Sequence, residues 1–169
     1  FDNIRASEMV VGDMEAQIAA AKIGAQRYIE IVEKYELETV QAATEELMNY
    51  SEKMMRNSIM KLPDGEYSAE GYLDGYLDSN DENKKDLKIV VTVKVQDSDI
   101  TIDLTGTSPQ IPDKPINMPL IGTVDIAIYL TLRSILLDSV DYGNFPQNTG
   151  LTRPITIVAP KGTLCNPEF

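Results

Sequence analysis

Residues 87–104 read LKIVVTVKVQDSDITIDL and decide the fold of the second half of the chain. Ile89, Val91, Val93 and Val95 are apolar at every second residue and so share one face, which is the period of a strand with one buried face. Residues 97–99 form a short polar turn, and residues 100–104 alternate again. This pattern predicts a β-hairpin.

Further elements flank this hairpin on both sides. Pro63-Asp64-Gly65 is a turn signal, because Pro presets one backbone dihedral and Gly accepts a positive φ. Residues 67–77 then predict a strand. After the hairpin comes a polar loop, residues 105–117, and then residues 119–137, which predict a buried helix because they are apolar on most sides. A last strand is predicted at residues 155–159.

The first 62 residues show the helical period instead. One apolar or small stripe runs through residues 14–35 in alternating steps of four and three, with Asp13 as the expected N-cap. A second stripe marks a helix over residues 38–61. The connection between them is very short, which predicts an antiparallel helical hairpin. The first stripe consists of Met14, Ile18, Ala21, Ala25, Tyr28, Val32 and Tyr35, and the second begins with Val40, Ala43, Leu47, Tyr50 and Met54.

The predicted fold class is α+β: an antiparallel helical hairpin followed by a mainly antiparallel sheet with one buried helix. The predicted domains are a helical hairpin at residues 1–62 and an α+β part at residues 63–169. The chain begins at Phe1 without an initiator Met and stops without a terminating element. We therefore expect a fragment of a longer chain.

The composition of the chain excludes some classes of binding partner. The net charge of −12 would repel the phosphates of nucleic acid and of anionic membranes. No run approaches the roughly 18 apolar residues of a membrane span, and no export leader is visible. A single cysteine fits a reducing compartment. We expect a cytoplasmic protein that contacts neither nucleic acid nor membrane.

The absence of histidine limits the chemistry. These residues supply no Ser-His-Asp triad, no Cys-His pair and no imidazole metal ligand. Cys165 lacks an activating base and is expected to be a packed core residue. The acidic run from Asp74 to Asp86 begins like an EF-hand at Asp78, but Asn83 and Ile89 stand where the bend glycine and the bidentate glutamate belong. No metal site is predicted within this chain.

One polar cluster can hold a ligand. Hydroxyl, amide and carboxylate groups gather in residues 103–117, at the end of the predicted hairpin, and the loop near residue 150 adds two more. Such groups orient a substrate by hydrogen bonds more readily than they transfer its protons. The alternative interpretation is a plain surface loop. The candidate substrate-binding residues are Asp103, Thr105, Thr107, Gln110, Asn117, Asn148 and Arg153, and no catalytic residue is assigned.

Several short strings occur in a fixed order along the chain. They are VGDMEAQIAA (11–20), YSE (50–52), LPDGEY (62–67), DLTGTSPQ (103–110), NMP (117–119), NTG (148–150), RPI (153–155), PKGT (160–163) and NP (166–167). Each string alone is weak, whereas their order is fairly specific. From about Ile4 to Phe169 the series resembles the hydantoinase B family, which includes N-methylhydantoinase B, the B-type part of 5-oxoprolinases and the alpha subunits of acetone carboxylases.

The resemblance implies a segment of a subunit that takes part in ATP-dependent hydrolysis of a cyclic amide of the hydantoin or 5-oxoproline type. It implies a hetero-oligomer with a hydantoinase A-type ATP-binding partner, which phosphorylates the carbonyl oxygen of a small-molecule substrate. ATP and a divalent metal are implied for the full complex, with the histidine ligands located before Phe1. The isolated segment is therefore expected to be inactive.

Two alternatives remain open. The segment could belong to the alpha subunit of an ATP-dependent ketone carboxylase of the acetone type, or it could be a non-catalytic scaffold. The sequence also departs from the family pattern in two places. Glu36 stands where a Gly is usual between the two helices, which predicts a strained or differently capped turn. Residues 72–76 follow the expected Asp-rich stretch only loosely.

Overall fold

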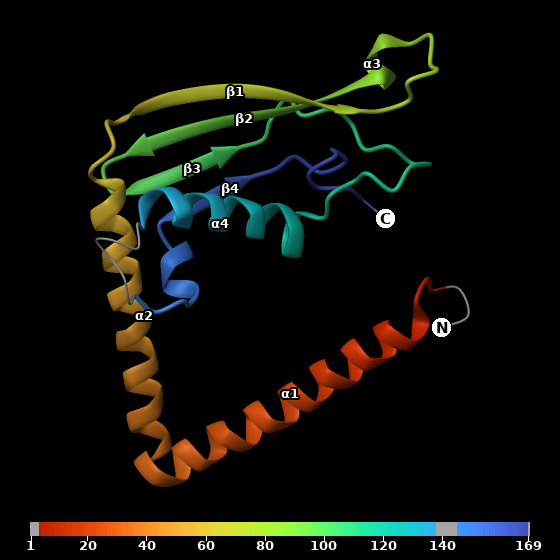
Figure 1. Ribbon diagram of the computed structural model, residues 1–169. Helices are drawn as coiled ribbons and strands as arrows, with labels where there is room; N and C mark the ends of the chain where they lie inside the picture. The colour runs from red at the N-terminus through yellow and green to blue at the C-terminus, as the bar shows by residue number, and fades with distance from the viewer. Residues whose placement is uncertain (1–3, 138–144, 169) are drawn as a thin grey trace. The chain divides into compact units, whose positions relative to one another are not determined.

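The computed structural model describes residues 4–137 and 145–168 (Figure 1). The chain divides into two compact units, Phe1–Glu46 and Leu47–Phe169. The boundary between them falls inside the second helix, whereas the sequence pattern predicted a domain boundary after residue 62. The described part is a mixed α+β structure, as the sequence predicted.

The first unit contains α1 (Ser7–Tyr35) and the start of α2 (Leu37–Ile59). Both helices were predicted, although α1 begins at Ser7, so Asp13 lies inside the helix and is not its N-cap. Within the first unit no described residue before Val40 is buried, and Ile18 is 55% exposed. Glu36 alone separates the helices, and a hairpin of helices needs a loop of about two to five residues.

The turn between the helices has an unusual backbone. Glu36 has φ 68° and ψ 146°, a conformation that is essentially confined to glycine. Its amide still donates to the carbonyl of Val32, at 2.8 Å, and so ends α1. The strain predicted for this position is thus present in the structure.

The second unit is built on a four-stranded sheet in the order β1-β2-β3-β4. β1 (Gly65–Asp74) pairs antiparallel with β2 (Asp86–Gln96) along its whole length, and a short helix, α3 (Glu82–Lys85), lies between them. β2 and β3 (Asp99–Asp103) form the predicted β-hairpin. β4 (Ile155–Val158) pairs parallel with β3. The sheet is therefore mainly antiparallel, as predicted.

The parallel pairing of β3 and β4 requires a crossover, which α4 supplies. The crossover contains a kinked turn, Leu120–Val124, followed by α4 (Asp125–Leu136). This helix lies along one face of the sheet (Figure 1). The helix was predicted, but its burial on most sides was wrong. Ile128 and Leu132 pack on the core, whereas Leu130 is 56% exposed and Ile135 is 69% exposed. A helix on a single sheet has only one covered face.

The core of the second unit joins α2, α4 and the sheet. Met55 and Ile59 of α2 are almost completely buried and belong to the same core cluster as Ile100 and Ile102 of β3. The buried face of α2 also includes Ser51 and Ser58, whose small side chains let neighbouring segments approach closely. Leu47 and Tyr50, which the sequence placed on the packed face, are about half exposed instead.

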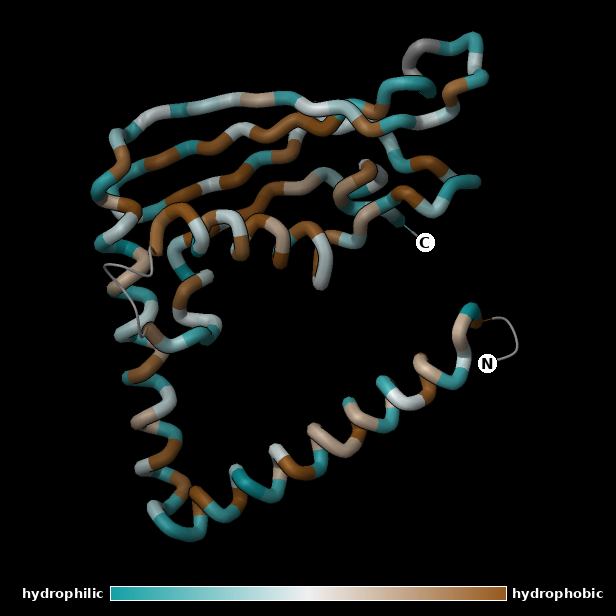
Figure 2. Tube along the Cα trace, viewed as in Figure 1, coloured by the Kyte–Doolittle hydropathy of each residue, from teal (hydrophilic) through white to brown (hydrophobic). Residues whose placement is uncertain are grey.

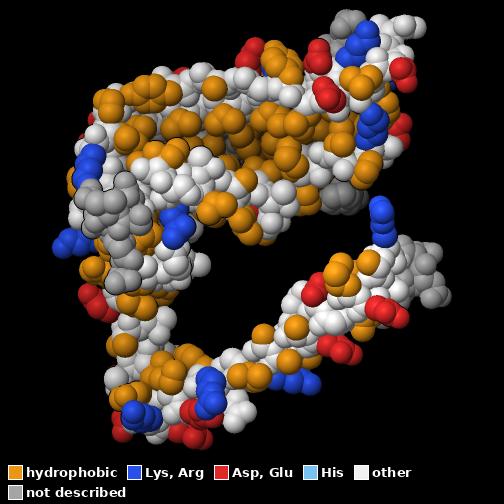
Figure 3. Space-filling model, in the orientation of Figure 1, with side chains coloured by type: hydrophobic (Ala, Val, Ile, Leu, Met, Phe, Trp, Pro, Cys, Tyr) orange, Lys and Arg blue, Asp and Glu red, His pale blue; other side chains and the backbone are white. Residues whose placement is uncertain are grey.

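An apolar groove lies between α4 and the sheet. Its volume is about 730 Å³, and the alternate residues of β2 from Ile89 to Val95 form one wall, as their period predicted. Figure 2 shows the apolar stretches that run along β2, β3 and α4. Figure 3 shows hydrophobic side chains gathered in a band over this part of the molecule. The opening of the groove leaves part of the sheet face uncovered.

Candidate functional site

The polar loop begins with a tight turn at the end of β3. The Asp103 Oδ1 atom accepts from the backbone amide of Thr105 at 2.8 Å. A hydrogen bond from the Thr105 hydroxyl is the main cause that lowers the pKa of the Asp103 carboxyl, and the bond from this backbone amide adds to it. Asp103 is therefore a fixed carboxylate and hydrogen-bond acceptor.

Thr107 and Ser108 continue the edge of the sheet beyond β3. The buried Thr107 hydroxyl accepts from the Val90 amide at 3.1 Å and donates to the Val90 carbonyl at 3.3 Å. The Ser108 hydroxyl accepts from the Lys88 amide at 2.9 Å. These side chains take the place of backbone partners, so that β2 stays paired after β3 has ended.

Asn117 and Gln110 each hold another part of the backbone with both ends of the side-chain amide. Asn117 accepts from the Ile111 amide at 2.8 Å and donates to the Ile111 carbonyl at 2.6 Å. Gln110 accepts from the Glu168 amide at 2.6 Å and donates to the Glu168 carbonyl at 2.9 Å. Each pair of bonds imitates one step of a β-ladder.

The five predicted residues of this loop thus lie in one region, and much of their hydrogen-bonding capacity is used inside the chain. A cavity of about 770 Å³ lies beside the same loop, and none of the five residues lines it. Its walls include Tyr76, Asp78 and Lys114. The Lys114 ammonium donates to the Gly75 carbonyl and lies 4.3 Å from the centre of the Tyr76 ring. The sequence pattern did not single out Lys114 or Tyr76.

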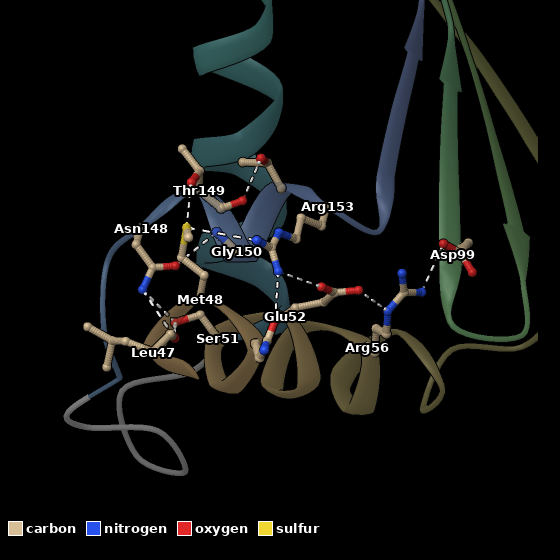
Figure 4. Close-up of polar contacts among 12 residues, drawn as sticks. Leu47, Met48, Ser51, Glu52, Arg56, Asp99, Asn148, Thr149, Gly150 and Arg153 are labelled. Carbon is tan, nitrogen blue, oxygen red and sulfur yellow. Dashed lines mark hydrogen bonds and ion pairs between the residues drawn. The ribbon is translucent and has the colours of Figure 1, made fainter. Parts of the chain in front are cut away.

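Asn148 and Arg153 belong to a second polar cluster, which forms where the loop before β4 meets α2 (Figure 4). The Asn148 amide donates to the Ser51 hydroxyl at 2.9 Å, and its oxygen accepts from the Gly150 amide at 2.9 Å. Arg153 donates to the Asn49 side chain at 2.8 Å. Both predicted residues therefore hold the loop against the helix.

Glu52 extends this cluster toward β3. Its carboxylate lies 2.8 Å from Arg56 Nε and 3.3 Å from Arg153 Nη1, and Arg56 continues to Asp99 at 2.9 Å (Figure 4). The hydrogen bond from Arg56 is the main cause that lowers the pKa of Glu52, against the opposing effect of burial, and Arg153 adds to it. The pKa of Arg56 is raised mainly by the same bond. These charges tie α2 to the start of β3.

Gly150 shows how closely the loop and the helix approach. A Cβ atom at this position would lie 2.1 Å from the carbonyl oxygen of Met48, which is far inside van der Waals contact. The lack of a side chain therefore permits this packing. The same approach lets the Asn148 side chain reach Ser51.

The two polar clusters lie at opposite ends of β3. Asp99, at the first residue of the strand, ends the α2 cluster, and Asp103, at the last residue, begins the polar loop. Four steps along a strand cover roughly 13 Å. The structure therefore brings Asn148 and Arg153 together with Glu52 and Ser51 rather than with the loop. The string Tyr50-Ser51-Glu52 was one of the resemblance strings and was the available signal for this cluster.

The displaced pKa values indicate which chemistry these groups favour. The pKa values of Asp103 and Glu52 are lowered, burial raises the pKa of the Cys165 thiol, and burial together with Asp125 raises the pKa of Tyr129. Each of these shifts moves the pKa further from 7, whereas a general acid or base works best with a pKa near the working pH. The described groups are therefore better suited to hydrogen bonding than to proton transfer at neutral pH. Cys165 is buried, as predicted.

Metal ligands do not gather in the described residues. Within residues 4–137 and 145–168, no three Cys, Asp or Glu side chains come together as metal ligands. These residues thus do not fit the divalent metal that the resemblance implies for the full complex. No helix in the described part has the length and apolar character to cross a membrane.

Comparisons with known proteins identify the relatives of this chain. The family model of Hydantoinase B/oxoprolinase matches residues 1–169. The chain is 82% identical to the B subunit of a putative D-/L-hydantoinase from Pseudomonas sp. (strain NS671), over 99% of this chain and 28% of that protein. It is 29% identical to the beta subunit of the caprolactamase of Pseudomonas jessenii, over 98% of this chain and 27% of that protein.

More distant relatives point the same way. The 5-oxoprolinase of Saccharomyces cerevisiae is 28% identical over 94% of this chain and 11% of its own length. The crystal structure of the ATP-dependent caprolactamase from Pseudomonas jessenii superposes with a TM-score of 0.74 at 26% identity, over 98% of this chain and 26% of that one. The chain thus spans little more than a quarter of the relatives that it matches best among these. It belongs to the hydantoinase B/oxoprolinase family.

Proposed function

We propose that this chain is part of a B-type subunit that takes part in ATP-dependent hydrolysis of a cyclic amide, with a hydantoin as the substrate. The observation that carries the proposal is the 82% identity to the B subunit of a putative D-/L-hydantoinase over 99% of the chain. The caprolactamase and 5-oxoprolinase relatives support the broader reaction, since their names describe the opening of cyclic amides.

The physical logic concerns the amide carbonyl, which is a poor electrophile. Transfer of a phosphoryl group from ATP to the carbonyl oxygen, with ADP as the leaving group, would make the carbonyl carbon a better electrophile. Water would then add to this carbon, and the ring C–N bond would break as the nitrogen takes a proton. Hydrolysis of the resulting acyl phosphate would release phosphate and leave the carboxylate. We assign the ATP-dependent step to an A-type partner subunit and the metal to residues outside this chain. Because ATP is the phosphoryl donor, we place the reaction in the cytoplasm.

In this scheme the chain's own residues position the substrate. The seven candidate residues remain part of this proposal, either as substrate contacts or as residues that hold the contacting segments in place. Asp103 and Thr105 are the most available of them, because Asp103 is only partly buried and Thr105 is exposed. Thr107, Gln110 and Asn117 would hold that turn in place through their backbone bonds.

Reconstitution tests the reaction type. The complete B-type subunit that carries this sequence would be mixed with its A-type partner, and hydantoin consumption would be followed with ADP formation. We expect both to depend on ATP and on the presence of both subunits. Carboxylation of acetone in place of hydantoin hydrolysis would contradict the proposal and support the ketone carboxylase alternative.

A scaffold role without substrate contact is the second candidate, and the internal bonds of the polar loop favour it. Asp103→Asn in the complete complex separates the two roles. Loss of turnover with normal subunit assembly supports a substrate-binding role. Unchanged turnover supports the scaffold. Asp64→Asn is a control only for surface charge, because Asp64 accepts from the Asp97 amide in a different turn.

A further inference from the structure

The apolar groove between α4 and the sheet has no part in the reaction proposed above. Its volume is about 730 Å³, and Ile89, Val91 and Val93 of β2, which line it, are only half buried. On the wall that α4 forms, Ile135 is 69% exposed, and Tyr67 of β1, which also lines the groove, is 49% exposed. Side chains with the pattern of a core face are thus left open among the described residues.

The width of the sheet explains why one helix leaves such a groove. Adjacent strands lie about 4.8 Å apart, so the axes of the four strands span roughly 14 Å. A helix with its side chains is about 10 Å wide and covers about two strands. Gly71 of β1, the partner of Ile89, shares this face, and a Cβ atom there would meet no atom within 4 Å. The face therefore has room for a second element beside α4.

The composition of the lining indicates which kind of occupant fits. None of the described residues that line the groove is charged, and the Thr131 hydroxyl already donates to the Ala127 carbonyl at 2.8 Å. Small-molecule sites combine apolar walls with a few polar groups that orient the ligand. Permanent contacts between polypeptide segments instead resemble a core that has been cut in half. The lining therefore favours a polypeptide segment with an apolar face.

Charge and chain length favour a segment of the same polypeptide. Two copies of this chain would repel each other, because each has a net charge of −12. The relative with 82% identity matches over 28% of its own length, so nearly three quarters of that protein lies outside the matched part. A segment that is tethered to this chain has a high effective concentration at the groove, which a separate partner lacks.

We propose that a helix from the remaining part of the B-type subunit fills this groove and packs beside α4. Neighbouring helices lie about 8–10 Å apart, which matches the part of the sheet that α4 leaves uncovered. The added helix would turn an apolar stripe toward the groove and polar side chains away from it. This inference does not depend on the proposed reaction, because it rests on the groove and on the length of the relatives.

Photo-cross-linking in the complete B-type subunit tests the proposal. Ile135→p-benzoylphenylalanine places a photoreactive group on the groove wall, at a side chain that is exposed enough to accept it. We expect a product with the mass of one subunit, in which residue 135 is joined to a peptide from outside residues 1–169. Peptide mass spectrometry identifies that peptide, whose apolar residues should recur at helical intervals. Thr131→p-benzoylphenylalanine, one turn earlier, repeats the test if the first variant does not fold.

The other occupants would give different products. A product with the mass of two subunits would assign the groove to a second copy, and a product that contains the A-type partner would assign it to that subunit. Either result would overturn the proposal. A cross-link to a peptide within residues 1–169, or the absence of any protein cross-link, would overturn it as well.

Thr131→Glu and Ser134→Glu form a matched pair of variants of the same subunit. Both hydroxyls belong to exposed residues of α4 and donate to the carbonyl four residues earlier, but of the two only Thr131 lines the groove. Thr131→Glu would bury a carboxylate against the added helix and should lower the melting temperature by at least about 4 °C. Ser134→Glu should leave it nearly unchanged. Equal melting temperatures of the two variants would overturn the proposal.

Discussion

The helical unit, Phe1–Glu46, and the sheet unit, Leu47–Phe169, differ in how many of their apolar side chains are buried. Both have regular apolar patterns, and in both the pattern predicts the secondary structure. In the described part of the helical unit only Val40 is buried, whereas the sheet unit buries residues from α2, from both ends of the segment that carries α4 (Val124 and Leu137) and from every strand except β1. The period of a sequence thus shows which face of an element is apolar, but not whether the same chain covers that face.

The largest expected effect concerns two isoleucines on helices of the two units. Ile59 is completely buried and Ile18 is 55% exposed. Ile59→Ala should lower the free energy of unfolding by about 2–5 kcal/mol, because it removes buried surface and leaves a cavity. Ile18→Ala should change it by less than about 0.5 kcal/mol. Urea denaturation followed by circular dichroism measures both, and equal effects would show that α1 is packed as well.

A second pair of variants tests the contact between α2 and the loop at Gly150. Gly150→Ala would place a Cβ atom 2.1 Å from the Met48 carbonyl oxygen, whereas Gly71 on β1 has no atom within 4 Å of such a Cβ. We expect Gly150→Ala to lower stability by about 1–3 kcal/mol, and Gly71→Ala to be neutral or slightly stabilising. Thermal unfolding gives both values. A harmless Gly150→Ala would mean that the loop does not approach the helix this closely.

At Glu36 we expect a substitution to raise the stability rather than to lower it. Glu36→Gly should stabilise the helical unit by about 1 kcal/mol, because glycine adopts φ 68° and ψ 146° without strain. The identical change at Glu33, inside α1, should destabilise it by about 1 kcal/mol. The thermal loss of helical ellipticity compares the two variants. Destabilisation by Glu36→Gly would contradict the observed backbone conformation.

The smallest effect concerns the charges around Glu52 and depends on pH. Glu52→Gln should cost about 1 kcal/mol at neutral pH, because the carboxylate is partly exposed. The folded state lowers the pKa of Glu52 below its ordinary value of 4.5, so its contribution is complete above that pH. It is lost as the pH falls through the lower folded-state value. The difference between the two proteins should therefore shrink in acid.

Denaturation curves recorded at neutral pH and at about pH 3 measure this difference. Glu66→Gln on β1 is a suitable control, because Glu66 is exposed on an edge strand. A difference that grows in acid would contradict the sign of the Glu52 shift.

The hairpin of β2 and β3 could be predicted because a short polar turn between two alternating runs leaves one pairing. The two long helices could be predicted for a similar reason. Their packing could not, because a stripe of one width suits a neighbouring helix, a sheet or a second chain equally well. The exposed face of α4 shows the same limit, since its apolar side chains exceed what one sheet covers.

The candidate site was predictable in composition and only partly in arrangement. The polar loop after β3 exists, and its side chains gather as expected. Their use as backbone partners could not be read from residue types, because Asn and Gln amides bind backbone and ligands through the same groups. The position of Arg153 depended on Glu52, which lies about a hundred residues away in sequence, and no local pattern reports such a contact.

Our central claim is that this chain supplies a positioning framework and does not by itself activate a carbonyl group. The most direct test is the steady-state rate of ATP-dependent hydantoin hydrolysis by the 169-residue chain, measured beside the complete B-type subunit with its A-type partner. We predict turnover by the complete pair and none by the chain alone. ATP-dependent hydrolysis by the chain alone would contradict this claim.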